Sequence, residues 1–422
     1  VTDLGPGDGG KGGVVHKLCI EHDAHTVLKV GGAQGSHGVR TSRGQSFNFS
    51  QFGCGTFEGV PTHVTNLMVI EPLGLVAEGN SLRYEKGVPE AFDLITVDRD
   101  CLCTTPFHRI ASRLRELARK GNQKGTIGVG VGEAKLDSEL HPELAVYARD
   151  IGKPGLRDKL EAVRQQKLVE LASIIENVRE LWPADHETAA REIAFLLNPD
   201  TVGAIAEGFE NMKAQVALVD AEYLEKEILQ KDGAFVVESS HGVLTDRYHG
   251  FHPYTSRLRT LPIATLNLLK EHGYDGEVVK YGVHRAYTIR HGAGPLVTES
   301  SELLGKLLPG SSKDENRWQG KVRVGALDLV ALRYAIAVCD GLRPFDALAI
   351  TWFDQIQAVG SWSTCNRYIG ATHGEFFWPD GEIRTSRHRA EDDEQLKRQG
   401  KLSELLFACR PEVESHPLPS GK

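Results

Sequence analysis

The sequence predicts an α/β fold with a central, mostly parallel sheet of the P-loop type, flanking helices, and a helical insertion at about residues 151–230. Three observations support this fold class. The chain starts with a short apolar segment that breaks into glycines and a lysine ahead of helix-compatible residues 14–20, which is the order strand, phosphate loop, helix. Later β-type segments also end in glycines and polar side chains, and a long segment of helical periodicity separates them. We therefore expect residues 1–422 to form a single domain that contains the insertion.

The composition is that of an ordinary globular protein, since 25% of the residues are charged and 40% are apolar. The net charge of −8 argues against nucleic-acid binding, so we expect phosphate recognition to be local. No signal peptide precedes the first strand and no apolar run reaches the ~18 residues of a membrane span, so no membrane partner is expected. The seven cysteines have neither disulfide-scaffold nor zinc spacing, which favours a reducing cytoplasm. Because the numbering starts at Val1, almost within the first strand, we expect an initiating segment to precede it.

The first dozen residues contain the clearest motif. Gly5-x4-Gly10-Lys11 fits the Walker pattern up to its last position, where Gly12 replaces the usual serine or threonine. Glycines allow backbone N–H groups to converge on an anion at a helix N-terminus, and Lys11 adds a positive charge. Without the hydroxyl, a magnesium ion needs another oxygen ligand, and Asp8 is the nearest candidate. The alternative interpretation is a glycine-rich turn that only starts an α/β domain.

The second strand also leads into a candidate site residue. Residues 26–30 form a compact β run that opens into the glycine-rich turn 31–38, which carries His37. We expect this turn to lie on the same edge of the sheet as the first loop, because the carboxyl ends of parallel strands meet there. His37 is therefore a candidate catalytic group beside Asp8 and Lys11, although a lone histidine is more often structural. The segment 125–132 alternates glycine with β-branched residues and predicts a flexible loop or a strand beside a ligand.

The remaining elements follow from periodicity and turn residues. Residues 156–182 keep helical spacing of apolar side chains until Pro183. The strand expected at 234–238 is followed by Ser239, Ser240, His241 and Gly242, so polar residues again stand at a strand's carboxyl end. Further strands are expected at residues 64–70, 277–281, 286–289 and 347–353, and further helices at 109–119, 187–197, 201–218, 327–339 and after 391. The final proline- and serine-containing residues are expected to be frayed.

Taken in order, these motifs resemble the adenylosuccinate synthetase family over nearly the whole chain. The family's first loop, GDEGKG, matches residues 7–12, and its GGxNAGHT turn matches residues 31–38. Its EGAQG turn matches residues 238–242, and its VGxGPFPTE turn matches residues 291–299. The helical insertion falls between the second and third motifs, as in the family. The order and spacing of the four motifs carry the resemblance.

The resemblance implies a Mg²⁺-dependent ligase. A base removes the N1 proton of a 6-oxopurine nucleotide, O6 takes the γ-phosphoryl group of a nucleoside triphosphate, and the amine of L-aspartate displaces the activated oxygen. By resemblance, Asp8 is the base, His37 is the acid, Lys11 holds the triphosphate, and Asp8 and Ser36 bind the metal. The residues matched to the triphosphate site are Gly7, Gly9, Gly10, Lys11, Gly12, Ser36, His37, Gly38, Trp352, Phe353, Asp354 and Pro411.

The resemblance also assigns the other two substrates. The residues matched to the purine monophosphate site are Asp8, Gln34, Thr126, Ile127, Arg149, Ser240, His241 and Ser256, and those matched to the aspartate site are Arg317, Lys321 and Arg323. Arg149 corresponds to an arginine that the family supplies across a dimer interface. A homodimer is therefore expected.

The chain departs from the family at four places that concern specificity. Gly9 replaces the glutamate after the catalytic aspartate, and His241 replaces a glutamine that contacts the base edge. The family's TKLD, whose lysine and aspartate frame the guanine of GTP, is TWFD at residues 351–354. The family's arginine-rich loop, which binds aspartate, matches residues 317–323, and these contain fewer arginines than the family loop. Arg323 is the best candidate to bind the carboxylate of aspartate.

The first two changes enlarge or re-polarise the pocket beside N1, C2 and O6, where IMP and GMP differ by one amino group. The pattern is similar to the bacteriophage branch of the family, which makes 2-amino-2'-deoxyadenylosuccinate from dGMP, with ATP or dATP, for 2-aminoadenine DNA. We therefore expect dGMP, L-aspartate and ATP or dATP as substrates, in the host cytoplasm if the chain is phage-encoded. The alternatives are an ordinary adenylosuccinate synthetase that uses IMP and GTP, and a non-catalytic P-loop nucleotide-binding module.

Overall fold

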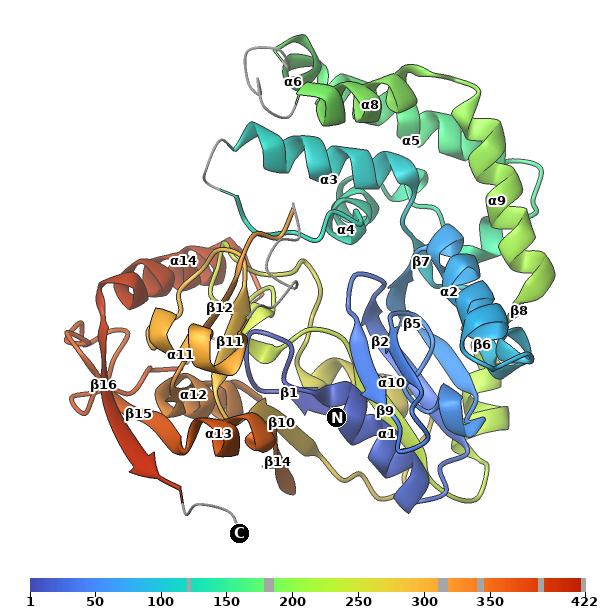
Figure 1. Cartoon of the computed structure of the whole chain (residues 1–422). Coiled ribbons are helices and arrows are strands. Elements are labelled where there is room, and N and C mark those ends of the chain that lie inside the picture. Colours follow the sequence, from blue (N-terminus) through green and yellow to red (C-terminus); the bar gives the residue numbers. More distant parts are fainter. Residues whose placement is uncertain (120–122, 178–185, 310–317, 340–344, 386–390, 419–422) are drawn as a thin grey trace. The chain divides into compact units, whose positions relative to one another are not determined.

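The structure is a computed structural model of the 422 residues (Figure 1). It describes all of them except 120–122, 178–185, 310–317, 340–344, 386–390 and 419–422. Arg317 and the end of the helix predicted at 156–182 thus lie outside the described residues. The contacts group the chain into two compact units. That the units together form one domain stays a prediction. The glycine-loop unit comprises Val1–Val14, His241–Leu268 and Asp275–Lys422, and the six-strand unit comprises Val15–Ser240 and Leu269–Tyr274.

The six-strand unit is built on a parallel sheet of order β8-β6-β5-β2-β9, with β7 also paired to β5. Its strands are β2 (Thr26–Gly32), β5 (Thr62–Ile70), β6 (Ile95–Asp98), β7 (Leu102–Cys103), β8 (Ala217–Val219) and β9 (Phe235–Ser239), and a separate hairpin joins β3 (His37–Arg40) to β4 (Ser46–Phe49). The strand β2 is buried along nearly its whole length, as a central parallel strand is expected to be. Its register places Lys29 opposite Glu238 of β9, so two charged residues meet inside the sheet.

Helices accompany this sheet. They are α2 (Pro72–Glu85), α3 (Pro106–Ala118), α4 (Val131–Leu140), α5 (Leu156–Glu170), α6 (Ala172–Glu176), α8 (His186–Leu197) and α9 (Thr201–Gln215), with short turns η1 (Thr56–Glu58), η2 (Ala91–Leu94), η3 (Pro142–Leu144), η4 (Ala148–Asp150) and η5 (Leu224–Leu229). Helix α9 packs on α2 and α5, and α3 packs on α4, α5 and α8. The helices of the predicted insertion, α5, α6, α8 and α9, form the group at the top of Figure 1.

The glycine-loop unit contains three smaller sheets. A parallel sheet has the order β1 (Thr2–Asp3), β10 (Tyr281–Arg285), β14 (Ala347–Thr351). The strands β11 (Thr288–His291) and β12 (Val322–Gly325) pair antiparallel, and β15 (Ser361–Ile369) lies between β13 (Leu327–Asp328) and β16 (Arg410–Pro417). The helices are α11 (Ser301–Leu307), α12 (Leu329–Cys339), α13 (Phe353–Val359), α14 (Asp393–Ala408) and the short η6 (Val243–Thr245). Two helices, α1 (Lys11–Glu21) and α10 (Pro262–Glu271), contribute residues to both units.

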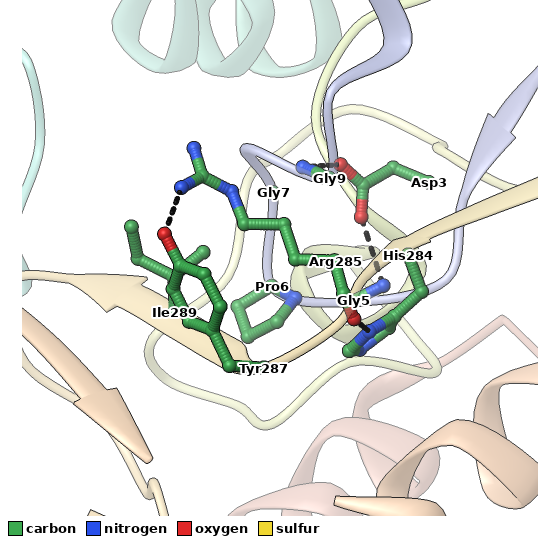
Figure 2. A pocket seen from close by; sticks show the side chains of 9 residues that line it. All are labelled: Asp3, Gly5, Pro6, Gly7, Gly9, His284, Arg285, Tyr287 and Ile289. Atoms are coloured by element: carbon green, nitrogen blue, oxygen red, sulfur yellow. Dashed lines mark hydrogen bonds between the residues drawn. The ribbon is translucent and has the colours of Figure 1, made fainter. Parts of the chain in front are cut away.

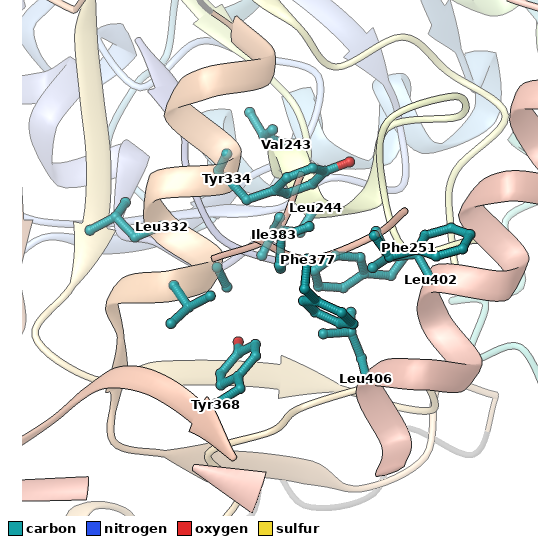
Figure 3. Packing of buried hydrophobic residues seen from close by; sticks show 14 of the residues in the cluster. Val243, Leu244, Phe251, Leu332, Tyr334, Tyr368, Phe377, Ile383, Leu402 and Leu406 are labelled. Carbon is teal, nitrogen blue, oxygen red and sulfur yellow. The ribbon is translucent and has the colours of Figure 1, made fainter. Parts of the chain in front are cut away.

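A buried apolar cluster supports the start of the glycine loop. Side chains of α12 and α14, including Tyr334 and Leu402, pack with Phe251, Tyr368 and their neighbours (Figure 3). Each fully buried side chain of this size contributes about 1.5–3 kcal/mol. Leu4, which directly precedes the loop, belongs to the same cluster and is fully buried. The loop is therefore anchored in the core on its N-terminal side.

The predicted α/β class with a mostly parallel sheet is confirmed, but several details differ. The first two strands do not share one hydrogen-bonded sheet, since β1 pairs with β10 while β2 pairs with β5 and β9. The strand predicted at 277–281 is at Tyr281–Arg285, because polar His284 and Arg285 are buried there by specific partners. Residues 410–417, which were expected to be frayed, form β16 because β15 supplies backbone partners. The segment predicted as one helix at 201–218 ends at Gln215, and β8 follows as an edge strand. No described helix is long and apolar enough to cross a membrane.

Candidate active site

The glycine loop joins β1 to α1, and Lys11 is the first residue of that helix. Gly7 and Gly10 have φ angles of 121° and 90°, which side chains other than glycine rarely adopt. A Cβ atom at Gly10 would lie only 2.8 Å from Thr351 Oγ1, so β14 approaches the loop closely. The turn therefore leads directly into a helix N-terminus, which is where proteins commonly bind anions.

Asp3 supports the loop from below, and the sequence did not predict this role. Its carboxylate is fully buried and accepts hydrogen bonds from the backbone N–H of Gly5, at 2.8 Å, and of Gly9, at 2.7 Å (Figure 2). Lys11 Nζ donates to Asp3 Oδ2 at 3.0 Å and to the carbonyl of His241 at 2.7 Å. Asp3 thus sets both the shape of the loop and the position of its lysine.

Asp3 also gives a local reason for Gly9. A Cβ atom at this position would lie 2.7 Å from Asp3 Oδ2, so any side chain there would force the buried carboxylate to shift. The aspartate below the loop therefore favours glycine at position 9. Its predicted effect on the purine pocket stays a prediction.

Asp8, the predicted base, is held by its backbone and by its side chain. Its φ angle is 59°, and Arg285 Nε donates a hydrogen bond to its carbonyl oxygen. His291 Nε2 lies 2.7 Å from Asp8 Oδ2, and 42% of the Asp8 side chain is exposed. Desolvation raises the pKa of the Asp8 carboxyl, but the hydrogen bond and charge of His291, with Arg285 and Lys11, outweigh it and hold that pKa below its ordinary value. Asp8 is therefore an ionised carboxylate at neutral pH.

Two predicted base-contacting residues stand at similarly strained backbone positions. His241 has a φ angle of 63°, and Trp352, which directly precedes α13, has one of 58°. The guanidinium of Arg285 lies 4.4 Å from the centre of the Trp352 ring. Phe353 packs edge-on against Trp362 at 5.4 Å, and Asp354 is exposed.

Among the described residues, four that are not glycine have positive φ angles: Asp8, Asp23, His241 and Trp352. Three of the four belong to the site predicted from the sequence, and all three lie in the glycine-loop unit. Such conformations cost roughly 1–3 kcal/mol each and persist where the surroundings enforce them, which is common at functional sites. The strain therefore marks this part of the predicted site independently of the motifs.

The structure describes only some of the residues predicted to bind aspartate. Arg323 donates to Glu299 and to the carbonyl oxygens of Gly292 and Gly294, so it braces the turn after β11. Lys321 is exposed, and Arg317 lies outside the described residues. In the same unit, Ser256 accepts a hydrogen bond from the Leu258 N–H, and Pro411 stands at the start of β16. Their substrate contacts stay predictions.

The six-strand unit contains a buried charge cluster around the predicted acid. His37, the first residue of β3, is 7% exposed, and its Nδ1 lies 2.5 Å from Glu238 Oε1. Lys29 Nζ is also 2.5 Å from this oxygen, and the Cys54 N–H donates to Oε2 at 2.8 Å. Burial raises the pKa of Glu238, but Lys29 and His37 hold that pKa well below its ordinary value. Nδ1 is engaged by a carboxylate, so any proton transfer by His37 must use Nε2.

The other predicted residues of this unit have varied surroundings. Ser36 and Gly38 are exposed, and Gln34 is half-buried. The Ser240 hydroxyl is buried and donates to the Val30 carbonyl at 3.1 Å, so it has a structural partner already. Thr126 and Ile127 lie in the loop before α4, as the glycine-rich segment predicted. Arg149 pairs with Asp100, stacks 4.2 Å from the centre of the Tyr147 ring, and has 44% of its side chain exposed.

The structure therefore brings the predicted residues together as two groups. Asp8, Lys11, His241 and Trp352 lie in the glycine-loop unit, and His37, with the monophosphate residues of the first half of the chain, lies in the six-strand unit. Their cooperation in one site stays a prediction.

The comparisons with known proteins decide the family. The family model described as adenylosuccinate synthetase matches residues 2–392. The chain belongs to the adenylosuccinate synthetase family. It is 29% identical over 376 residues to the adenylosuccinate synthetase of Thermus thermophilus, covering 87% of this chain and 82% of the relative. It is 28% identical over 370 residues to that of Chlorobium luteolum, covering 86% and 78%. It is therefore a C–N ligase of purine biosynthesis.

A solved structure supports the fold. A fully ligated adenylosuccinate synthetase from Plasmodium falciparum aligns with a TM-score of 0.70 at 16% identity, covering 100% of this chain and 88% of that chain. The cyanophage S-2L succinoaminodeoxyadenylate synthetase, bound to dGMP and dATP, aligns over 94% of this chain and 97% of that chain at 14% identity. Its TM-score is 0.48, which is too low to bear on the substrate.

The magnesium ion implied by membership of this synthetase family needs oxygen ligands. Asp8 offers an exposed carboxylate and Ser36 an exposed hydroxyl, and both suit Mg²⁺. Within the described residues, His37, Cys54 and Glu238 also lie close enough together to bind one ion. That group does not suit Mg²⁺, because thiol and imidazole are softer ligands and the Lys29 ammonium already occupies the carboxylate. Asp8 is the better candidate to hold the ion.

Sequence reasoning missed several residues that shape the synthetase site. Asp3, Arg285 and His291 contact the loop, and Lys29 pairs with Glu238. The available signal was a charged residue inside an otherwise apolar strand, as at Asp3 and Lys29, because such residues are rarely buried without a partner. The partners themselves are far away in the sequence and left no local pattern.

Proposed function

We propose that the chain joins L-aspartate to C6 of dGMP, with ATP or dATP as the phosphoryl donor, and releases 2-amino-2'-deoxyadenylosuccinate, (d)ADP and phosphate. One observation carries the proposal. The two positions that resemble the family's base-reading residues, His241 and Trp352, are both substituted, and both have strained backbone angles in the same unit. A residue that differs from the family and still has an energetically unfavourable φ angle is a candidate for changing the nucleotide specificity.

On the purine side, the difference to be recognised is the 2-amino group that dGMP has and IMP lacks. Leaving such a group buried without a partner costs about 1–3 kcal/mol, which is a ten- to hundredfold preference. An imidazole at His241 has two ring nitrogens, one a donor and one an acceptor when neutral, where glutamine presents an amide oxygen and an NH2 group. The absence of a carboxylate at Gly9 removes a negative charge next to Asp8.

On the donor side, the lysine that would frame guanine is replaced by Trp352. The guanidinium of Arg285 lies over this ring, so an aromatic plane and a cation stand together close to the glycine loop. A flat aromatic surface favours stacking of a purine base without reading its hydrogen-bonding edge. The loss of the lysine that would frame guanine, with this stacking surface, supports an adenine donor, ATP or dATP.

The chemistry then divides among the residues of the chain. Asp8 accepts the N1 proton, so that O6 becomes nucleophilic and attacks the γ-phosphorus while (d)ADP leaves. Lys11 and the loop N–H groups bind the phosphates, and His37, oriented by Glu238, stabilises the transferring phosphoryl group through Nε2. The aspartate amine next attacks C6, loses its proton, and expels the phosphate. A bound magnesium ion would neutralise charge on the donor phosphates.

The decisive experiment incubates the protein with aspartate and each pairing of IMP, GMP or dGMP with GTP, ATP or dATP. Formation of the succinyl adduct is followed by mass spectrometry. A dGMP preference supports the proposal, and an IMP preference contradicts it. In His241→Gln, the ratio of kcat/KM for dGMP to that for IMP should fall about tenfold or more, because the family's residue is restored. No adduct with any pairing would indicate a nucleotide-binding module instead of a ligase.

We also propose that the active unit is a homodimer, in which Arg149 of one subunit contacts the monophosphate bound by the other. The exposed part of the Arg149 side chain supports this role. Its pairing with Asp100 and stacking on Tyr147 hold the guanidinium in one orientation on the surface. Mixing an Asp8→Asn protein with an Arg149→Leu protein tests the proposal, because a hybrid dimer would contain one intact site.

A further inference from the structure

The surroundings of Asp8 contain a residue to which neither the motifs nor the family comparison assign a role. His291 is the last residue of β11, and its Nε2 lies 2.7 Å from Asp8 Oδ2. We propose that His291 is a positioning residue for the base: it fixes one carboxylate oxygen of Asp8 so that the other can accept the purine N1 proton. The inference rests on the proposed function, because it assumes that Asp8 is the base.

The direction of the hydrogen bond follows from chemistry. An ionised carboxylate only accepts hydrogen bonds, so His291 must carry its hydrogen on Nε2 and donate it to Asp8. A charge-assisted hydrogen bond of this kind is roughly twice as strong as a neutral one. The Asp8 side chain is 42% exposed, and its carboxylate is held by the hydrogen bond to His291. The bond to His291 is therefore what selects its rotamer.

The backbone of Asp8 is fixed separately. Its φ angle of 59° is unusual for a residue that is not glycine, and Arg285 donates to its carbonyl oxygen. Thr351 Oγ1 donates to the carbonyl of the next residue, Gly9, at 2.6 Å. Arg285 and Thr351 can act whatever the side chain at position 8 is. His291 acts through the carboxylate and thus affects the proton-accepting atoms directly.

The support for His291 is rigid. It is paired with Val322 in the antiparallel ladder of β11 and β12, and its side chain is only 20% exposed. Arg323, the neighbour of Val322, donates to the carbonyls of Gly292 and Gly294 and so fixes the turn that follows His291. An imidazole held in this way can preorganise a base on an exposed loop.

The experiment compares His291→Leu with His291→Gln in the full chain, on the purine nucleotide that the wild type uses best. The leucine variant removes the donor, and kcat should fall by about ten- to a hundredfold, as expected for losing a hydrogen bond to a charged group. The KM for the triphosphate should stay within about twofold. The glutamine variant keeps an N–H donor near the place of Nε2 and should recover most of kcat. His373→Leu is the matched control, because His373 is exposed and should leave kcat unchanged.

Three results would overturn the proposal: an unchanged kcat in His291→Leu, a raised KM for the triphosphate with kcat intact, or an equal loss of kcat in His291→Gln. Melting temperatures of all variants are measured in parallel. If the leucine variant does not fold, His291→Asn replaces it, since the shorter amide cannot reach Asp8 and should lose kcat where glutamine does not. An IMP preference of the wild type would contradict the dGMP proposal but leave this comparison valid. A wild type without ligase activity would overturn both.

Discussion

The two units hold their candidate catalytic groups by opposite means. In the six-strand unit, His37 is buried, and its ring is fixed by Glu238, which is paired with the buried Lys29. In the glycine-loop unit, Asp8 is partly exposed and is fixed by a strained backbone and by polar contacts from Arg285 and His291. The candidate acid therefore depends on the same charges that stabilise the sheet, whereas the candidate base depends on local geometry. Substitutions in the first group should lower stability and activity together, and those in the second should lower activity with little effect on stability.

The largest effect on stability should come from Lys29→Met. The side chains of Lys29 and Glu238 are both completely buried. Among the described residues, removing the ammonium leaves this carboxylate with His37 and Cys54 as its partners and without a permanent cation. Breaking a buried pair in this way costs about 3–5 kcal/mol. The free energy of unfolding is measured by urea denaturation of the full chain. The control is Lys17→Met, which breaks an exposed pair with Glu21 and should cost at most about 1 kcal/mol. Equal costs in the two variants would remove the contrast between the units.

In the other unit, Asp8→Asn should lower kcat by at least ~10² while the stability changes by less than about 1 kcal/mol. Asparagine has the same shape and tolerates a positive φ angle, so the loop should keep its conformation, but the amide cannot accept the N1 proton. Steady-state kinetics and thermal unfolding are measured on the same preparation. Retained activity would reassign Asp8 to a structural role. A large loss of stability would show that the loop, like the sheet, depends on its charge.

A smaller effect on stability is expected from pH, because the six-strand unit buries the titratable carboxyl of Glu78. Burial raises the pKa of Glu78 to about 7, although the N–H groups of Gln51, Ser50 and Phe52 lower it. The folded state thus binds the Glu78 proton more tightly than the unfolded state does. The contribution of this proton to the free energy of unfolding is complete below pH 4.5 and is lost as the pH rises through about 7. The loss should amount to at most about 3 kcal/mol. The difference in unfolding free energy between the wild type and Glu78→Gln should change over this window, and a constant difference would contradict the raised pKa.

The smallest signal is expected from mixing two inactive variants, Asp8→Asn and Arg149→Leu. The mixture tests whether Asp8 and Arg149 of one active site come from different chains. Neither Asp8→Asn nor Arg149→Leu should be active by itself. In a hybrid dimer, the site with an intact Asp8 can receive an intact Arg149 from the other subunit, so a quarter of all sites should recover at equal mixing. Activity is measured after exchange of labelled subunits has been verified. If exchange occurs and the mixture stays inactive, the shared site is excluded.

The sequence by itself determined the fold class, the position of the glycine loop, and the four motifs that place the chain in its family. It could do so because glycines with positive φ angles, apolar periodicity and polar residues at strand ends are local requirements that leave a local pattern. The strands β2, β5 and β9 and the helices α3, α8 and α14 were predicted within a few residues for this reason. The candidate residues Asp8, Lys11 and His37 came from the same kind of pattern.

Only the tertiary structure decided which partners these residues have. Asp3 lies beneath the loop that Lys11 closes, His291 reaches Asp8 across 283 positions of sequence, and Glu238 meets His37 across 201. The register of β2 with β9, which puts Lys29 opposite Glu238, and the pairing that turns residues 410–417 into a strand were also invisible locally. Hydrogen bonds and ion pairs between distant segments depend on how strands align in space, and no periodicity or propensity of either segment encodes that alignment.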